Sequence, residues 1–304
     1  MKKILLSLLI LAGCSGGDSD QEEFTFRFNP PDTVRYTMGV VGERGTKIGS
    51  TIAIDTNLGF SRFVMVAKGQ GYEVISSTDS TRLISNGQVI DDPIQKLFAN
   101  AVITRQLDSN GYTTVVSGYQ EIFRVLDSAF EPAVAKAVRQ RLDPAVLEQK
   151  EAEEWNRSYA ALVGRSCRLG EYSYSVEDLG MVSGVNLSYF TATVLVDTSR
   201  IDGQLCGRLS TVGDTDPNLL ANLISVPPEQ VMKEFDLSDS AALELAGSPI
   251  GSAMYTESIM EMETMLLHSD KAGRELRQTL PDSTGQPETR IFFESQSRQY
   301  VYQR

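Results

Sequence analysis

The chain has 304 residues, of which 28 are Lys or Arg and 40 are Asp or Glu, so its formal net charge at neutral pH is −12. A protein this acidic is repelled by nucleic acid and by anionic membrane surfaces, which argues against nucleic-acid binding. The hydrophobic fraction of 41% is ordinary for a globular protein and is enough to form a core.

The N-terminal stretch has the pattern of an export signal. Lys2 and Lys3 precede a short apolar run, Ile4–Ala12, which is far shorter than the roughly 20 residues that span a bilayer. A charged start, a short apolar segment and a small-residue site are typical of cleaved signal peptides. The segment ends in Leu-Ala-Gly-Cys, at Leu11–Cys14, and this sequence resembles the lipobox of bacterial lipoproteins.

This resemblance implies that residues 1–13 are a signal peptide and that the Cys14 sulfur carries a diacylglycerol, with a further acyl chain on the new amino terminus. Two or three acyl chains anchor a protein stably, whereas one chain binds only marginally. Residues 14–23 are otherwise small and acidic, which predicts a flexible tether. Ser15 after the cysteine favours the outer membrane in enteric-type sorting. We therefore expect an outer-membrane protein that faces the periplasm, with the cell surface as the alternative.

Two cysteines remain once Cys14 is lipidated, Cys167 and Cys206. An even number of thiols in an oxidising compartment favours a disulfide, and closing a loop of about 40 residues would stabilise the fold by roughly 4 kcal/mol. The alternative is two buried thiols, because spacing does not show proximity. Neither cysteine has a nearby His or second Cys, so we expect neither a metal site nor a cofactor.

Residues 24–90 have the pattern of an antiparallel meander. Phe24–Phe28 alternates apolar and polar side chains, as a half-buried strand does. Asn86-Gly87 predicts a tight hairpin turn, and the glycines between residues 39 and 45 are expected in turns as well. Four further strands are expected, at Val34–Val41, Lys47–Asp55, Gly59–Ala67 and Tyr72–Ile84.

A second hairpin, centred on Asp108–Gly111, precedes a helical region. Apolar residues recur at helical spacing from Ile122 to Phe130, and Pro132 suits the first turn of the next helix.

A longer helix is expected from Pro144 to about Leu162, with Asp143 as its N-cap. It contains Trp155, the single tryptophan of the chain. We expect this helix to pack across the sheet, with the charged residues 148–154 on its solvated face.

The second half returns to strands, expected at Glu171–Val176, Leu187–Asp197, Cys206–Val212, Met254–Leu267, Arg274–Leu280 and Arg290–Tyr302. Asp202-Gly203 predicts another hairpin, and Pro227–Glu229 and Ala241–Ala246 mark a loop with one or two short helices. The pattern predicts an α+β fold of antiparallel, β-rich curved sheets covered by helices. The repeated order of strands and helices suggests a tandem duplication, with units 24–163 and 164–304.

The layout resembles a group of uncharacterised bacterial lipoproteins, which combine a lipobox, an acidic tether and a β-rich body with an Ile-x-x-x-Leu-Asp-x-x-Gly hairpin, here Ile103–Gly111. This resemblance covers most of the body but implies no known activity and no functional residues. A looser, architectural resemblance is to the curved half-barrels of periplasmic lipoprotein and lipid carriers. Those carriers open with an amphipathic helix, whereas this body opens with the expected strand Phe24–Phe28.

No catalytic constellation is visible. Gly13–Gly17 matches the Gly-x-Ser-x-Gly pattern of serine hydrolases, but it lies in the lipobox and not between a strand and a helix. His268 is the only histidine, so a catalytic triad or a histidine general acid would have to use it. Its position beside Leu267 predicts a polar residue where a strand runs into a turn. Gly39–Gly45 and Gly69–Gly71 lack the spacing of phosphate-binding loops.

Two acidic pairs and a methionine cluster could in principle hold a metal. Asp91–Asp92 and Asp214–Asp216 match no EF-hand loop, so solvated loop carboxylates are expected. Four methionines between residues 254 and 265 could offer thioethers to Cu(I). The alternation of Met260 and Met262 with glutamates more simply predicts packing on one face of a sheet.

These features favour a lipid-anchored cell-envelope protein that binds and does not catalyse. The first version is an interaction module that holds a protein partner or an envelope polymer near the membrane. The second is a carrier of a lipid or other hydrophobic ligand, in a cavity between the sheet and the 144–162 helix that Met260 and Met262 would line. The third and least favoured is an envelope hydrolase built on carboxylates or an unusual serine.

Overall fold

The computed structural model describes residues 22–91, 101–182, 185–281 and 284–303. Its strands are β1 (Glu23–Thr25), β2 (Thr33–Ile48), β3 (Thr51–Lys68), β4 (Gly71–Ser85), β5 (Gln88–Ile90), β6 (Val102–Leu107), β7 (Thr113–Ser117), β8 (Ser166–Arg168), β9 (Tyr172–Val182), β10 (Val185–Ile201), β11 (Gln204–Asp214), β12 (Ile250–Glu261), β13 (Leu267–Pro281) and β14 (Pro287–Gln303). Its helices are α2 (Tyr119–Ala129), α3 (Pro132–Arg141), α4 (Pro144–Ser158), the short 3₁₀ helix η1 (Ala160–Leu162), α5 (Pro217–Ile224), α6 (Pro228–Glu234) and α7 (Asp239–Ala246).

One large sheet contains most of these strands, in the order β7-β6-β4-β3-β2-β14-β13-β12-β11-β10-β9, with β5 beside β4. The pairing of β2 with β14 is antiparallel and joins the two predicted halves, 24–163 and 164–304, into a single sheet. β1 and β8 form a separate two-stranded sheet. The predicted β-rich, antiparallel architecture with covering helices is therefore confirmed at this level, while the duplication stays a prediction.

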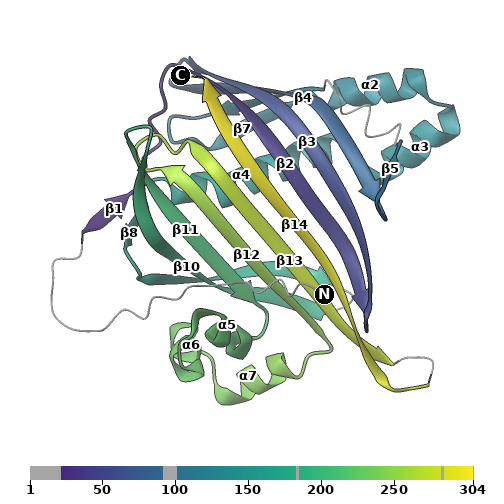
Figure 1. Ribbon diagram of the computed structural model, residues 1–304, viewed down its shortest axis with the longest axis vertical. Helices are drawn as coiled ribbons and strands as arrows, with labels where there is room; N and C mark the ends of the chain where they lie inside the picture. Colours follow the sequence, from purple (N-terminus) through teal and green to yellow (C-terminus); the bar gives the residue numbers. More distant parts are fainter. Residues whose placement is uncertain (1–21, 92–100, 183–184, 282–283, 304) are drawn as a thin grey trace.

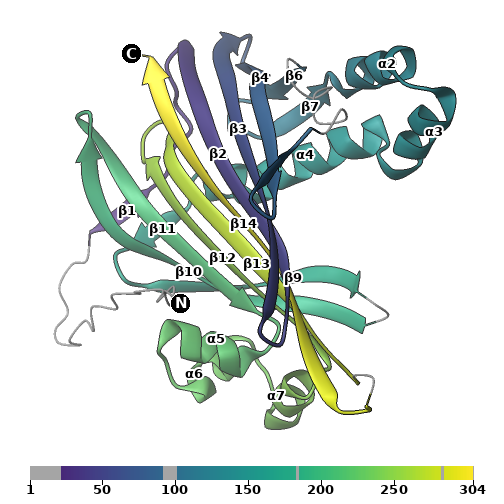
Figure 2. The same ribbon diagram turned by 45° about the vertical axis from the view of Figure 1, so that its right-hand side comes forward.

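The sheet is strongly curved, and α4 lies on its concave side (Figure 1). Figure 2 shows the same arrangement from a second direction, with α2 and α3 projecting beyond the edge formed by β6 and β7. At the α4 end, the concave side is closed by a packed apolar core to which β1, α4 and η1 contribute. Its buried members include Phe26, Phe28, Tyr36, Met65, Tyr159 and Met260.

The opposite face of the sheet is covered locally by α5, α6 and α7, which lie between β11 and β12 in the chain. Phe190 and Ala192 of β10 pack there against Leu220, Ile224 and Val231. The sequence predicted one or two short helices in this region, whereas the structure has three. The one that was missed, α5, begins with Pro217 at its first turn, and Asp216 caps it by accepting a hydrogen bond from the Asn218 N–H.

The predicted helices of the first half are confirmed. α3 and α4 each begin with a proline, where a missing N–H costs nothing. The Asp143 carboxylate accepts hydrogen bonds from Ala145 N and Val146 N, as expected of an N-cap. The predicted helix to Leu162 is α-helical as far as Ser158 and continues after Tyr159 as η1.

The strand expected at Phe24–Phe28 is confirmed only as far as Thr25, where β1 ends. Two other strand predictions are wrong because a turn falls inside each of them. Lys47–Asp55 spans the turn between β2 and β3, which lies at residues 49–50. Met254–Leu267 spans the turn between β12 and β13, where Met265 adopts a positive φ of 57°. Apolar and β-branched residues flank both turns, so composition did not reveal them. No helix among the described residues is long and apolar enough to cross a membrane.

Candidate functional site

Beyond the apolar core at α4, the concave side of the sheet carries two rows that are mainly polar, although Met254 stands beside Arg274 and the next row contains Leu276 and Phe292. Residues opposite one another in antiparallel strands share a face, so each cross-strand row can be followed in the register. We call the polar part the polar concave face. It comprises Ser173, Ser175, Thr191, Thr193, Thr211, Thr256, Gln296, Arg274, Glu294, Arg44 and Asp55.

A row of hydroxyl groups crosses this face from β9 to β12. Ser173, Thr193, Thr211 and Thr256 are paired in register on four successive strands. The hydroxyls of Thr193 and Thr211 are hydrogen-bonded at 2.9 Å. Threonine suits a strand and also presents a hydroxyl that can donate and accept, so this row offers hydrogen bonds along its length.

A row of alternating charge lies farther from α4. Arg274, Glu294, Arg44 and Asp55 stand opposite one another on β13, β14, β2 and β3. The Arg274 Nε lies 2.7 Å from Glu294 Oε1, and the Arg44 Nε lies 3.6 Å from Asp55 Oδ2. Because three of these side chains are more than half exposed, the pairs contribute little to stability and their charges face solvent.

A more buried pair, Asp270 and Arg298, separates the core from these polar rows. The Arg298 Nη1 donates to Asp270 Oδ2 at 3.0 Å, and its Nη2 donates to Gln296 Oε1 at 2.6 Å. Burial raises the pKa of Asp270, and the nearby Arg298 guanidinium opposes that shift. Asp270 Oδ1 is buried and has no hydrogen-bond partner among the described residues.

His268 lies at the start of β13 and not in a turn, so the prediction for this residue is wrong. Its Nε2 is 3.1 Å from Oε1 of Glu261, a residue that is only 2% exposed. The Thr264 hydroxyl donates to the other oxygen of the same carboxylate at 2.6 Å. The three residues tie the end of β12 to the start of β13. Sequence pattern could not show this, because Glu261 alternates with methionines as a solvent-facing residue would.

The charged residues 148–154 of α4 were all expected on its solvated face, but one of them, Glu151, contacts β6 and α2 instead. Glu151 accepts hydrogen bonds from the Arg105 guanidinium and from the Tyr119 hydroxyl. Burial, followed by the contact with Glu151, raises the pKa of Tyr119. The Trp155 Nε1 donates to the Gly111 carbonyl at 2.9 Å, which fixes α4 to the β6–β7 hairpin. Among the charged residues 148–154, Glu151 therefore has a structural role.

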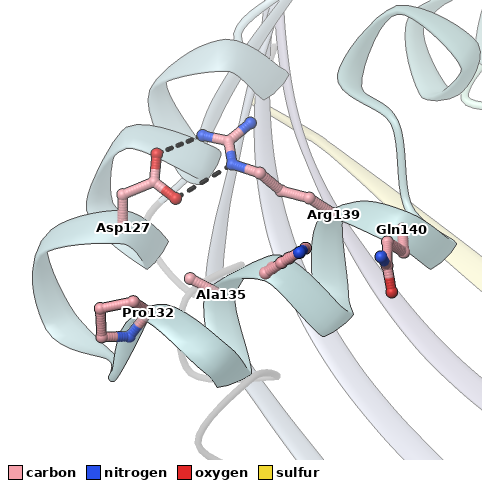
Figure 3. A pocket seen from close by; sticks show the side chains of 6 residues that line it. Asp127, Pro132, Ala135, Arg139 and Gln140 are labelled. Carbon is pink, nitrogen blue, oxygen red and sulfur yellow. Dashed lines mark hydrogen bonds and ion pairs between the residues drawn. The ribbon is translucent and has the colours of Figure 1, made fainter.

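Two hollows are present beside these elements. One, of about 280 Å³, is bordered by β1, β8, β9 and β10 and includes Ser173 and Thr193 of the polar concave face. The other, of about 460 Å³, lies between α2 and α3 (Figure 3). In the second hollow the Arg139 guanidinium forms a two-point ion pair with Asp127 and lies over the Phe123 ring. These contacts pair Asp127 with Arg139 and hold α2 to α3.

The structure does not contain the predicted disulfide, since Cys167 and Cys206 both keep their thiols. The two residues belong to different sheets. Cys167 pairs with Phe24 in the two-stranded sheet, whereas Cys206 pairs with Ser199 and Glu261 inside the large sheet. Burial raises the pKa of the Cys167 thiol. Cys14 lies outside the described residues, so its lipidation stays a prediction.

The predicted solvated carboxylates of Asp214–Asp216 are instead structural. Asp214 is 2% exposed, and Arg277 Nη2 donates to its two oxygens at 2.8 and 2.7 Å. Burial raises the pKa of Asp214 despite this pair. Of the other predicted pair, Asp92 lies outside the described residues. Within the described ranges, no group of three or more His, Cys, Asp or Glu residues is arranged to hold a metal ion.

The methionines at the β12–β13 turn are core residues, as their alternation predicted. Met260, Met262 and Met265 are 1%, 5% and 0% exposed and belong to the core on the concave side. Met254 pairs with Gly213 and Arg274 on the neighbouring strands.

No protein-family model matches the chain, and no curated protein matches it. Among solved structures, the chain is similar to lipovitellin, in a structure concerned with its lipid–protein interactions, at 10% identity and a TM-score of 0.45. That match covers 91% of this chain and 26% of the lipovitellin chain, so the chain spans about a quarter of that protein. OccK11 (OpdR) and OpdQ of Pseudomonas aeruginosa match at 7% and 6% identity with TM-scores of 0.17, covering 92% and 90% of this chain and 99% of each of theirs. These scores are too low to assign a shared fold.

Proposed function

We propose that the protein is a lipid-anchored component of the bacterial cell envelope, held in the outer membrane through acylated Cys14, that binds a polar partner on its concave face without catalysis. The partner is a segment of another envelope protein or of an envelope polymer. The observation that carries the proposal is the composition of the polar concave face.

A curved sheet can serve a ligand in two ways, and the lining decides between them. An apolar lining suits a lipid, whereas hydroxyl and charged groups suit a chain with its own hydrogen-bonding groups. Here Thr193, Thr211 and Thr256 are followed by the alternating row that starts at Arg274 and Glu294. These groups present donors and acceptors in register across several strands, which favours an extended polar partner.

The lining of the concave side also makes the carrier version less favoured. It required an apolar cavity under α4, with Met260 and Met262 in its lining. Both methionines are packed in the core with Tyr159, the residue that follows α4. The observation that still speaks for a carrier is the strong curvature of the sheet (Figure 1).

The anchor is tested by metabolic labelling with an alkyne-bearing palmitate analogue in a bacterial host. The wild-type chain is expected to take up the label and to sediment with membranes, because acyl chains on Cys14 hold it there. A Cys14→Ser variant should lose both properties, while Cys167→Ser, the matched control, keeps them. Label on the Cys14→Ser variant would refute the anchor.

The choice between partner binding and carriage is tested by native mass spectrometry of residues 20–304 after gentle purification from the periplasm. We expect the bare protein mass, because a polar partner is lost when the envelope is disrupted and no lipid occupies the core. A bound mass that extracts into organic solvent would favour the carrier instead.

A further inference from the structure

The 280 Å³ hollow at the edge of the concave face contains two arginines on an otherwise acidic protein. Arg165 precedes β8 and Arg168 is its last residue. Hydroxyl groups of Ser166, Ser173 and Thr193 line the same space. We call this hollow the arginine pocket.

The charge of these arginines is only weakly neutralised. The Arg165 Nη2 donates to the Ser173 hydroxyl, a neutral group, and no ion pair links Arg165 to a carboxylate in the part of the chain that the structure describes. Arg168 lies 3.7 Å from Glu171, and both side chains are more than half exposed, so solvent screens that pair. Glu23 also lines the pocket. The lining of the pocket thus combines two guanidinium groups with two carboxylates, of which Glu171 is the one beside Arg168.

Guanidinium groups and hydroxyls together match one class of ligand. The planar fork of arginine donates two parallel hydrogen bonds to a phosphate group and keeps its charge at every physiological pH. Serine and threonine hydroxyls complete such a site as neutral donors.

The position of the pocket along the chain indicates where that phosphate comes from. Glu23, which lines the pocket, is nine residues after Cys14 in the sequence. A fully extended chain spans at most about 3.5 Å per residue, so the tether holds the pocket within about 32 Å of the anchoring acyl chains. Leu169, next to Arg168, is 48% exposed, so an apolar side chain accompanies the arginines.

We propose that the arginine pocket binds the phosphate group of a membrane phospholipid and thereby orients the body on the membrane that anchors it. This inference rests on the proposed lipid anchor at Cys14. The net charge of the chain repels an anionic surface in general, and the two arginines supply attraction at the end nearest the tether.

The test uses the full-length lipidated chain reconstituted into two kinds of vesicle. One contains equal parts phosphatidylethanolamine and phosphatidylglycerol, and the other contains digalactosyldiacylglycerol, which has no phosphate. Cys167 lines the pocket and is half-buried, so its alkylation by iodoacetamide, followed by mass spectrometry of its peptide, reports whether the pocket is occupied. We expect alkylation several-fold slower in the phospholipid vesicles.

Variants separate the pocket from general shielding by the membrane. The double substitution Arg165→Gln and Arg168→Gln should abolish the difference between the two vesicles. Arg200→Gln is the matched control, because its guanidinium donates to the Gly203 carbonyl at the β10–β11 hairpin and does not line the pocket. Circular dichroism of each variant shows that it is folded.

Each outcome bears on a different claim. Equal alkylation rates in the two vesicles, for a chain that floats with both, would overturn the pocket and leave the anchor intact. A chain that fails to float with either vesicle would contradict the anchor itself. Equal protection by inorganic phosphate in detergent micelles would assign the pocket to a soluble anion and overturn the phospholipid.

Discussion

At the scale of single residues, buried polar groups hold the closed end of the concave side together. The Tyr159 hydroxyl donates to the Met265 carbonyl, which belongs to the β12–β13 turn. The Tyr302 hydroxyl donates to the Leu267 carbonyl at 2.6 Å on the other side of the same turn. Such bonds matter because a buried carbonyl left without a donor keeps the full cost of its lost hydration.

Tyr159→Phe is therefore expected to lower the free energy of unfolding by about 1–3 kcal/mol, since it removes the donor and leaves the buried Met265 carbonyl unpaired. Urea unfolding followed by circular dichroism measures this loss. Tyr112→Phe is the matched control, because Tyr112 is 41% exposed, and it should change little. Equal effects of the two substitutions would show that the hydroxyl of Tyr159 has no structural role.

The buried Asp270 predicts a pH dependence with a definite sign. Its pKa is raised above the ordinary value of 3.8, mainly by burial, so the folded state favours the protonated acid. Its contribution to stability is present below pH 3.8 and is lost as the pH rises through the raised pKa. Asp270→Asn should therefore become more stable relative to wild type as the pH rises through that window, as urea unfolding at a series of pH values would show.

Asp127 provides the opposite case. The hydrogen bond from Arg139 lowers its pKa, so its contribution is present above pH 3.8 and is lost as the pH falls. Asp127→Asn should gain stability relative to wild type as the pH falls. The same slope for both substitutions would contradict the assigned direction of one pKa shift.

At the scale of elements, the glycines of β2 explain one failure of sequence-based prediction. Gly42 and Gly45 were expected in turns, yet β2 continues through both to Ile48. A Cβ on Gly45 would lie 2.7 Å from the ring of Phe293 on β14, so this glycine makes room for an aromatic side chain on the neighbouring strand. No feature of the sequence around Gly45 indicates that this glycine will contact Phe293, which lies in the last strand of the chain.

Gly45→Ala is expected to destabilise the sheet by about 1–3 kcal/mol, since the added methyl group must displace the Phe293 ring or the backbone of Ala53. Gly39→Ala, on the same strand, meets no atom within 4 Å and should be neutral or slightly stabilising. Thermal unfolding of the two variants makes the comparison. A harmless Gly45→Ala would mean that β2 does not pair with β14 in this register.

Other elements could be predicted because the residues that determine them are neighbours in the sequence. Asn86-Gly87 and Asp202-Gly203 form hairpin turns with positive φ at both residues. Such turns favour Asn-Gly and Asp-Gly, because these residues tolerate a positive φ. Asp143 and Pro144 start α4 through contacts within a single turn. The polar concave face has no such local signal, because its residues come together only when the register of eight strands is known.

At the scale of the whole molecule, three features that lie far apart in the sequence are neighbours in the fold. Under the proposed lipid anchor at Cys14, the N-terminal strand β1 would lie near the membrane, and β1 pairs with β8 beside the arginine pocket. The pocket shares Ser173 and Thr193 with the polar concave face. Anchoring, orientation and partner binding would therefore involve one continuous surface.

The central claim is that a partner binds on the concave face, and site-specific photo-crosslinking in living cells tests it most directly. Thr256 and Glu257 are neighbours on β12, both half-buried, and they point to opposite faces of the sheet. With p-benzoylphenylalanine at each position in turn, we expect an adduct with an envelope protein or polymer from position 256 and none from position 257. Adducts of equal yield from both positions, or only lipid adducts from position 256, would contradict the account.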